Sequence, residues 1–446
     1  MLHPPPSALM TDLYQLNMMQ AYLDQGMTDT AVFEFFSRAL PDDRCFYMAA
    51  GLETVLSDLE GLRFTEEELA WLRESGRFKD NLLDYLADFR FTGDVHAMAE
   101  GTVFFPSEPM LRLTAPLPMA QFLETRLINI LHFQSVIATK ASRMVLAADG
   151  RPLVDFGLRR AHGMEAGLFA ARSAYLAGFS GTATVTAGPM FDIPLFGTMA
   201  HSFILAHESE LQAFLHYARS RPEGLVLLID TYDTEQGART AVEAAQILAA
   251  EGIPLRAVRL DSGDRIALSH AVRDILDAGG QEATTILVSG GLDEQKIAAM
   301  VAANAPIDGF GVGTSLVTSE DDPVFDCAYK LHAYAGQAKR KKSAGKATWP
   351  GAKQVFRRYD PQGRMNGDIL TVAEDRQDGE ALLQPAMVGG QRIAPAPSFT
   401  ERRTRAAGQL AALPETLKIL EGNAFYPVAI APALDALTAK VDAQKH

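Results

Sequence analysis

The sequence contains very little cysteine and no long apolar run. Only Cys45 and Cys327 occur among 446 residues, so neither a disulfide framework nor a cysteine-rich metal site is expected. No stretch has the about 20 apolar residues that a membrane helix needs. The opening residues, MLHPPPSALM, lack the charged and apolar regions of a signal peptide. We therefore expect a reducing, cytoplasmic environment.

Positive charge is also scarce. Lysine and arginine number 41 against 55 aspartates and glutamates, which gives a formal net charge of -14. An acidic surface repels nucleic-acid phosphates and anionic lipid, so neither nucleic acid nor a membrane is an expected partner. A few local arginines and backbone N–H groups can still bind an anionic metabolite.

Alternating strands and helices characterise the middle of the chain. The strand-like runs are PLVDFG from Pro152, ATVTAG from Ala183, LVLLID from Leu225, LRAVRLD from Leu255, TTILVSGG from Thr284 and GFGVGTSLV from Gly309. Amphipathic helical patterns separate most of them, which predicts parallel strands with right-handed crossovers. A closed or nearly closed α/β barrel is favoured, and an open doubly wound sheet is the alternative.

The two ends of the chain have a different pattern. Residues 31–37 predict a strand, and residues 65–75 predict a helix with Thr65 and Glu68 as its capping box. We expect segments 1–148, 149–330 and 331–446, with the last packing on the first as a second, discontinuous α/β domain. The basic segment Lys339–Lys353 is interpreted as a solvated loop, and a lid over phosphate is the alternative.

Glycine-rich sequences follow two of the predicted strands. The carboxyl ends of parallel strands meet on one face, where ligands bind in such folds. Ser289–Gly291 (SGG) and Gly309–Ser315 (GFGVGTS) would both lie there. Glycine lets backbone N–H groups approach a phosphate closely, although a tight turn explains either sequence alone.

Carboxylates end two neighbouring strands. Asp230 and Asp261 come directly at the strand ends, where they would suit ribose hydroxyls and Mg²⁺. Asp233 and Asp264 stand three residues further on, and helix capping explains them equally well.

Three arginines and one histidine are expected at the same face. Arg159, Arg160 and Arg259 could clamp pyrophosphate, the alternative for each being a surface ion pair. His201, in FGTMAHSF, could be a nucleophile toward a phosphoryl group or a structural residue.

Taken together and in order, these motifs resemble the nicotinate phosphoribosyltransferase family. The resemblance covers nearly the whole chain, through TDLYQLNM, FEFFSR, ETRLINILHFQSVIATKASR, DFGLRRAHG, AGFSGTATV, FGTMAHSFI, LLIDTYDT, VRLDSGD, ILVSGGLDE, FGVGTSLVTS and KATWPGAKQVFR. It implies the irregular α/β barrel of type II phosphoribosyltransferases with a second α/β domain from both chain ends. It also implies a homodimer whose active sites are shared between subunits.

The implied reaction joins nicotinate to phosphoribosyl pyrophosphate, giving nicotinate mononucleotide and pyrophosphate for NAD biosynthesis. The family uses Mg²⁺ and couples transfer to ATP hydrolysis, in the manner of a ligase, through a phosphohistidine that His201 matches. The resemblance also implies a role for each of several other residues: Tyr14 of a partner subunit and Phe156 on the two faces of the pyridine ring, Thr198 and Arg259 on nicotinate, Arg159 on pyrophosphate, Asp230 and Asp261 on ribose and Mg²⁺, and Gly290, Gly291, Gly311, Gly313 and Thr314 around the 5′-phosphate.

Other functions remain as alternatives. Nicotinamide phosphoribosyltransferase shares the fold but resembles this chain less, because it has an aspartate where GTATV has Ala183. Quinolinate would need a more basic pocket, and a barrel aldolase would need a Schiff-base lysine that these strand ends lack. A non-catalytic metabolite-binding barrel would not require His201, Asp230 and Asp261.

Overall fold

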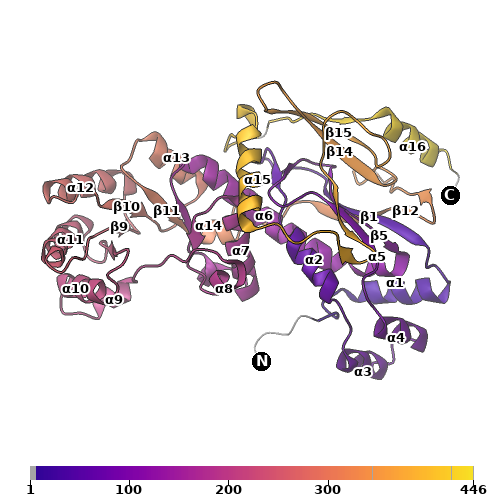
Figure 1. Ribbon diagram of the computed structural model, residues 1–446, viewed down its shortest axis with the longest axis horizontal. Coiled ribbons are helices and arrows are strands. Elements are labelled where there is room, and N and C mark those ends of the chain that lie inside the picture. Colours follow the sequence, from indigo (N-terminus) through magenta and orange to yellow (C-terminus); the bar gives the residue numbers. More distant parts are fainter. Residues whose placement is uncertain (1–6, 344, 423, 445–446) are drawn as a thin grey trace. The chain divides into compact units, whose positions relative to one another are not determined.

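The computed structural model describes residues 7–343, 345–422 and 424–444, and it divides into two compact units. The first unit combines residues 1–139 with residues 324–446, and the second comprises residues 140–323 (Figure 1). The first six residues of MLHPPPSALM and Ala344 of the basic segment lie outside the described residues. The domain boundaries inferred from the sequence remain a prediction.

The second unit is built on a curled parallel sheet of six strands in the order β7-β6-β11-β10-β9-β8. The five strand pairings are all parallel, as the alternating pattern predicts. No pairing joins β7 to β8 among the described residues, so the barrel is open on one side. The strands are β6 (Leu153–Asp155), β7 (Gly181–Thr182), β8 (Val226–Leu228), β9 (Ala257–Leu260), β10 (Thr285–Val288) and β11 (Gly309–Val312).

Helices follow the strands of this sheet. They are α7 (Met164–Ala177), α8 (Ala187–Phe191), α9 (His201–Leu205), α10 (Glu210–Ser220), α11 (Thr234–Ala249), α12 (Arg265–Ala278), α13 (Glu294–Ala302), α14 (Thr314–Val317) and the 3₁₀ turn η1 (Leu158–Arg160). Asp233 and Asp264 accept hydrogen bonds from backbone N–H groups at the starts of α11 and α12. The capping interpretation is therefore confirmed for both aspartates.

The strand expected from Ala183 is wrong. The strand β7 consists of Gly181 and Thr182, which pair with Val154 and Asp155 of β6. Because β6 ends at Asp155, the ladder has no further partner residues, and the chain turns toward α8. On its outer side, β7 is covered by the segment 194–196, with a parallel bridge between Thr182 and Leu195.

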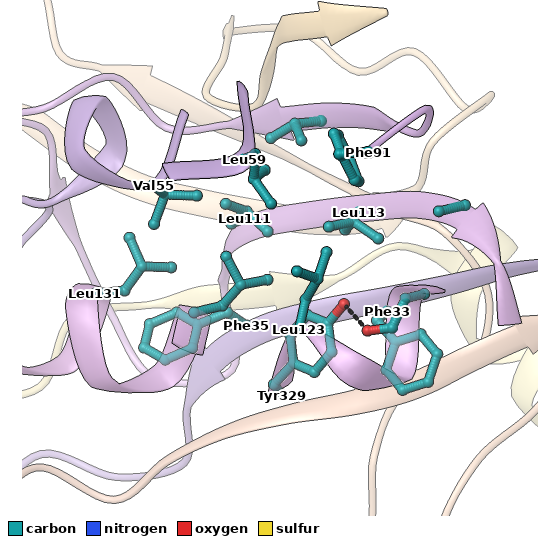
Figure 2. Packing of buried hydrophobic residues seen from close by; sticks show 14 of the residues in the cluster. Phe33, Phe35, Val55, Leu59, Phe91, Leu111, Leu113, Leu123, Leu131 and Tyr329 are labelled. Carbon is teal, nitrogen blue, oxygen red and sulfur yellow. Dashed lines mark hydrogen bonds between the residues drawn. The ribbon is translucent and has the colours of Figure 1, made fainter. Parts of the chain in front are cut away.

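The first unit contains a sheet of seven strands in the order β13-β12-β1-β5-β3-β17-β18. Its strands come from both chain ends: β1 (Thr30–Ser37), β3 (Asp94–Ala97), β5 (Pro109–Pro116), β12 (Cys327–Tyr334), β13 (Gln337–Ala338), β17 (Gln384–Val388) and β18 (Gln391–Arg392). Phe33 and Phe35 of β1 pack with Leu111, Leu113 and other buried apolar side chains of this unit (Figure 2). Tyr329 is buried there as well, and its hydroxyl donates to the carbonyl of Ala120.

Smaller elements complete the first unit. They are α1 (Leu13–Asp24), α2 (Leu52–Gly61), α3 (Glu66–Glu74), α4 (Asp80–Ala87), α5 (Leu117–Phe122), α15 (Phe399–Ala412), η2 (Glu415–Leu417), α16 (Pro432–Asp442), the pair β2 (Tyr47–Met48) and β4 (Val103–Phe104), and the sheet of β14 (Lys353–Tyr359), β15 (Met365–Val372), β16 (Glu380–Ala381) and β19 (Val428–Ile430). The helix α6 (Glu124–Ala148) crosses the boundary between the units. The capping box of Thr65 and Glu68 is confirmed at α3.

The basic segment is only partly a solvated loop. Lys341 and Lys342 are exposed, but Lys353 begins β14 and is buried. Its Nζ lies 2.7 Å from Glu34 Oε2 and donates to the carbonyls of Trp349 and Gly351. The interpretation as a solvated loop is therefore wrong for Lys353. Of the helices within the described ranges, none has both the length and the apolarity to cross a membrane.

Candidate active site

An apolar cavity of about 120 Å³ lies in the second unit at the inner side of the sheet. Its walls include four residues that the sequence singled out, Phe156, Thr198, Arg259 and Gly311. Aromatic and aliphatic walls with a few polar groups suit a small planar ligand.

Phe156 and Gly311 are packed directly against each other. Phe156 follows β6, and its N–H donates to the carbonyl of Val312 over 2.7 Å. A Cβ atom on Gly311 would stand 2.5 Å from Cε2 of the Phe156 ring. The glycine therefore leaves room for the aromatic ring. Gly311 borders the ring cavity, and its expected contact with a 5′-phosphate remains a prediction.

Arg259 brings a buried positive charge to this cavity. Its Nη1 donates to Asp261 Oδ1 and Ser289 Oγ, each over 3.1 Å, and its Nη2 donates to the Met199 carbonyl. Its Nε is buried without a hydrogen-bond partner among the described residues. Burial lowers the pKa of Arg259, and repulsion from Arg159 adds to this effect. An arginine nevertheless stays protonated in proteins, so a cation with an unused N–H lies beside the cavity.

Asp230, which follows β8, and His201, the first residue of α9, lie near each other. Asp230 Oδ2 accepts hydrogen bonds from the Asp261 N–H over 3.0 Å and from the Ser262 hydroxyl over 2.6 Å. Asp230 Oδ1 is buried without a hydrogen-bond partner in the described part of the chain, and His201 Nε2 lies 4.0 Å away. His201 Nδ1 is 3.1 Å from the Thr231 hydroxyl. The imidazole is thus held by Nδ1, while Nε2 is beyond hydrogen-bond distance of Asp230.

The sequence analysis missed Glu210, which lies close to this pair. Glu210 is the first residue of α10, and burial together with the charges of Asp230 and Asp233 raises its pKa to about 7. Its Oε1 is buried and has no hydrogen-bond partner within the described ranges. An acidic residue in the first turn of a helix is common, so only the folded structure distinguishes this one.

The sequence analysis also missed Arg265, which connects two strand-end loops. Its Nε donates to the Ser289 carbonyl over 3.0 Å, and its Nη2 donates to the carbonyls of Asp261 and Gly290. Arg265 has no carboxylate partner among the residues that the structure describes. Its charge is therefore available to an anion at the glycine loops.

The second glycine loop follows the neighbouring strand β11. Gly313 precedes α14, and Thr314 is exposed at the first position of that helix. Since β10 and β11 are paired, Gly290 and Gly291 after β10 lie at the same edge of the sheet as this loop. Arg159 is exposed on η1 and lies close enough to Arg259 for their charges to interact.

The carboxylates of the site are suited to binding Mg²⁺. Asp230 and Asp261 supply two carboxylates, and the unpartnered Asp230 Oδ1 is a buried oxygen that a cation would satisfy. No group of three or more His, Cys, Asp or Glu side chains arranged for a metal occurs in the described residues. Mg²⁺ commonly needs only one or two carboxylates, because substrate phosphates and water complete its coordination.

Comparison with known proteins decides the family. The profile described as the nicotinate phosphoribosyltransferase (NAPRTase) N-terminal domain matches residues 9–132, and that of the NAPRTase family matches residues 152–355. A nicotinate phosphoribosyltransferase of Mycobacterium tuberculosis is 50% identical over 425 residues, covering 95% of this chain and 91% of the relative. The chain belongs to the nicotinate phosphoribosyltransferase family.

Other nicotinate phosphoribosyltransferases agree with this membership. The enzyme of Bacillus subtilis is 37% identical, with 84% of this chain and 78% of the relative covered. The crystal structure of human nicotinic acid phosphoribosyltransferase superposes with a TM-score of 0.88 at 28% identity, covering 97% of this chain and 100% of the other. The expected type II phosphoribosyltransferase fold is thereby confirmed.

One residue expected in the nicotinate phosphoribosyltransferase site lies in the other unit. Tyr14 is on α1 of the first unit, 47% exposed, and its hydroxyl donates to Glu124 Oε2 over 3.3 Å. The other expected residues all belong to the second unit. The expected role of Tyr14 from a partner subunit at the pyridine ring stays a prediction.

Proposed function

We propose that the chain transfers the phosphoribosyl group of phosphoribosyl pyrophosphate to the ring nitrogen of nicotinate, giving nicotinate mononucleotide and pyrophosphate in NAD salvage. The observation that carries this proposal is the buried Arg259 cation, whose Nε is unused at the wall of a cavity suited to a flat ring. A carboxylate is the natural partner of such a buried guanidinium.

In this proposal nicotinate enters the cavity with one face on Phe156. Its carboxylate approaches Arg259 and the Thr198 hydroxyl, and both residues line the cavity. Tyr14 of a partner subunit covers the other face, so the active form is a homodimer with shared sites. Aromatic rings on both sides hold the substrate flat and exclude water.

Phosphoribosyl pyrophosphate lies at the strand ends next to the ring. Asp230 and Asp261 hold the ribose hydroxyls and Mg²⁺, Arg159 faces pyrophosphate, and the two glycine loops with Thr314 surround the 5′-phosphate. Bound Mg²⁺ would help to neutralise the departing pyrophosphate. The protein's part is to align the ring nitrogen with C1 of the ribose as that carbon gains oxocarbenium character, so catalysis depends mainly on positioning and electrostatics.

ATP is the proposed co-substrate, and His201 is the proposed phosphoryl acceptor. Thr231 holds Nδ1, and Nε2 has no hydrogen-bond partner among the described residues, which supports a nucleophilic role for the ring. A phosphoryl group on His201 would add negative charge near Asp230 and attract the arginines of the site. Its hydrolysis would then drive synthesis forward. We also propose that the enzyme works in the cytoplasm, as its low cysteine content favours.

A product assay tests the function. The protein is supplied with phosphoribosyl pyrophosphate and Mg²⁺, with nicotinate or nicotinamide, and with or without ATP. We expect nicotinate mononucleotide, pyrophosphate release and stimulation by ATP. Comparable kcat/KM for the two substrates would contradict the preference for nicotinate, and a higher value for nicotinamide would favour nicotinamide phosphoribosyltransferase. Absence of pyrophosphate release would favour a non-catalytic binding protein.

Subunit complementation tests the shared site. Tyr14→Ala and His201→Ala proteins, neither of which should show ATP-stimulated turnover alone, are mixed under conditions where subunit exchange is verified, and ATP-stimulated turnover is measured. Each mixed dimer would contain one site with both residues intact, so partial activity should return. No recovery would mean that the site is built within one chain.

A further inference from the structure

Two buried cations lie on one face of the helix α6. Lys140 and Arg143 are three residues apart on this helix, and their side chains are only 1% and 3% exposed. Lys140 Nζ lies 2.5 Å from Glu294 Oε2 and 2.7 Å from Asp321 Oδ1. Arg143 Nε lies 2.9 Å from Glu294 Oε1. A buried charge needs partners of opposite charge. Lys140 has two such partners, Glu294 and Asp321, and they lie on two different segments.

These two carboxylates belong to the segments that carry the glycine loops. Glu294 is the first residue of α13, three positions after Gly291. Asp321 is in the turn that follows α14, where the Asp322 N–H donates to the Ser319 carbonyl over 2.9 Å. Lys140 therefore joins the segment after β10 to the segment after β11 through a single ammonium group.

We propose that Lys140 is a positioning residue for phosphoribosyl pyrophosphate, because it fixes the spacing between the loop at Gly290 and Gly291 and the loop at Gly313 and Thr314. The inference rests on the proposed assignment of these loops to the 5′-phosphate. Lys140 acts through Glu294 and Asp321 and does not itself contact the substrate.

The two halves of this connection respond differently to loss of the lysine. Glu294 is fully buried but keeps Arg143 as a partner. The side chain of Asp321 is 33% exposed, so it can move into water when Lys140 is absent. The turn after α14 would then lose its ion pair with α6. The hydrogen bonds described above for His201, Asp230 and Arg259 do not involve that turn. Binding of phosphoribosyl pyrophosphate should therefore suffer before binding of nicotinate.

The test compares Lys140→Met with the wild-type enzyme. We expect KM for phosphoribosyl pyrophosphate to rise about tenfold, because small displacements of positioning groups have effects of this size or larger. The KM for nicotinate and the labelling of His201 by ATP should stay within about twofold. Asp321→Asn removes the carboxylate charge that faces Lys140 from the turn after α14 and leaves Glu294 in place beside Lys140. It should change the same KM in the same direction, and it decides the question if Lys140→Met does not fold.

A matched control comes from Lys353, which is also buried. Lys353 pairs with Glu34 in the first unit, where the two side chains are 3% and 0% exposed. Lys353→Met should lower the melting temperature without changing KM for phosphoribosyl pyrophosphate. An equal rise of that KM in Lys353→Met, or a parallel rise of both substrate KM values in Lys140→Met, would mean a general structural effect and overturn the inference.

A further variant separates this inference from the proposed function. Gly313→Val places a side chain in the loop that is assigned to the phosphate. If Gly313→Val raises KM for phosphoribosyl pyrophosphate and the folded Lys140 and Asp321 variants do not, the positioning role is wrong and the loop assignment stands. If all three leave that KM unchanged, the loop assignment itself is wrong.

Discussion

Gly290 lies so close to Asp261 that a Cβ atom on Gly290 would stand 2.0 Å from the Asp261 carbonyl oxygen. Gly290 also has a φ of +83°, a conformation that side chains rarely adopt. The two strand-end loops therefore meet backbone against backbone, and Arg265 donates to both from the side. No other residue type can occupy position 290 without moving the loop away from Asp261.

The first prediction is that Gly290→Ala impairs the use of phosphoribosyl pyrophosphate far more than Gly291→Ala does. Gly291 also has a positive φ, of +63°, but a Cβ there would meet nothing within 4 Å. The second variant therefore carries the backbone strain of about 1 kcal/mol without the collision. Steady-state kinetics with varied phosphoribosyl pyrophosphate measure the difference, and similar KM values would show that the contact between the loops is unimportant.

The second prediction concerns discrimination between the acid and the amide. Ala183 follows β7 and is exposed, so a larger side chain can be accommodated there. Ala183→Asp should lower kcat/KM for nicotinate at least about tenfold, because its carboxylate repels that of the substrate. Ala183→Asn has nearly the same volume without the charge and is the matched control. Equal losses in the two variants would attribute the effect to size.

The third prediction is that His201→Asn abolishes ATP hydrolysis and ATP stimulation but keeps slow, uncoupled transfer to nicotinate. Asparagine preserves approximate size and hydrogen bonding but cannot accept a phosphoryl group. Wild-type enzyme incubated with γ-labelled ATP should carry an acid-labile, base-stable label at His201. A label on another histidine, or ATP-stimulated turnover in the variant, would contradict the proposed mechanism.

The fourth prediction concerns stability and pH. Burial, reinforced by the charge of Lys353, lowers the pKa of His332 to about 4 from an ordinary value of 6.5. The unfolded chain therefore binds a proton between these values that the folded chain does not. The contribution of His332 to the free energy of unfolding is therefore fully present above about pH 6.5. It decreases as the pH falls toward 4, by on the order of 3 kcal/mol in all.

Urea unfolding between pH 4 and 7 measures this effect. His332→Gln removes the titrating group and should flatten the dependence in this window. His270→Gln, at an exposed histidine, is the control and should retain the wild-type slope. If His332→Gln keeps that slope as well, other groups cause the loss of stability at low pH.

Local patterns predicted much of the barrel. Apart from the strand expected from Ala183, the order of strands and helices from Pro152 is correct, because the two periodicities differ and each segment ends at a turn signal. The caps at Asp233 and Asp264 follow from the same reasoning, although the sequence could not exclude a ligand role. The strand expected from Ala183 failed because the length of β6, and not the propensity of the ATVTAG run, limits that ladder.

The contacts that tune the site were not predictable. Glu210 is far in sequence from Asp230, and only the packing of α10 beside the end of β8 raises its pKa. Arg265 stands directly after the VRLDSGD motif, yet it also donates to the carbonyls of Ser289 and Gly290 on another strand end. Outside the site, Lys353 belongs to a basic segment, and its partner Glu34 is on β1. Each case depends on a side chain that meets a residue many positions away.

The opening between β7 and β8 also bears on the solubility of the folded chain. An unpaired strand edge can recruit a strand from another molecule and begin aggregation. Here the outer edge of β7 is occupied, since the Thr182 N–H donates to the Pro194 carbonyl and the Phe196 N–H donates to the Thr182 carbonyl. The strand β8 at the other edge is only three residues long. An incomplete barrel of this kind therefore presents little backbone on which an intermolecular sheet could grow.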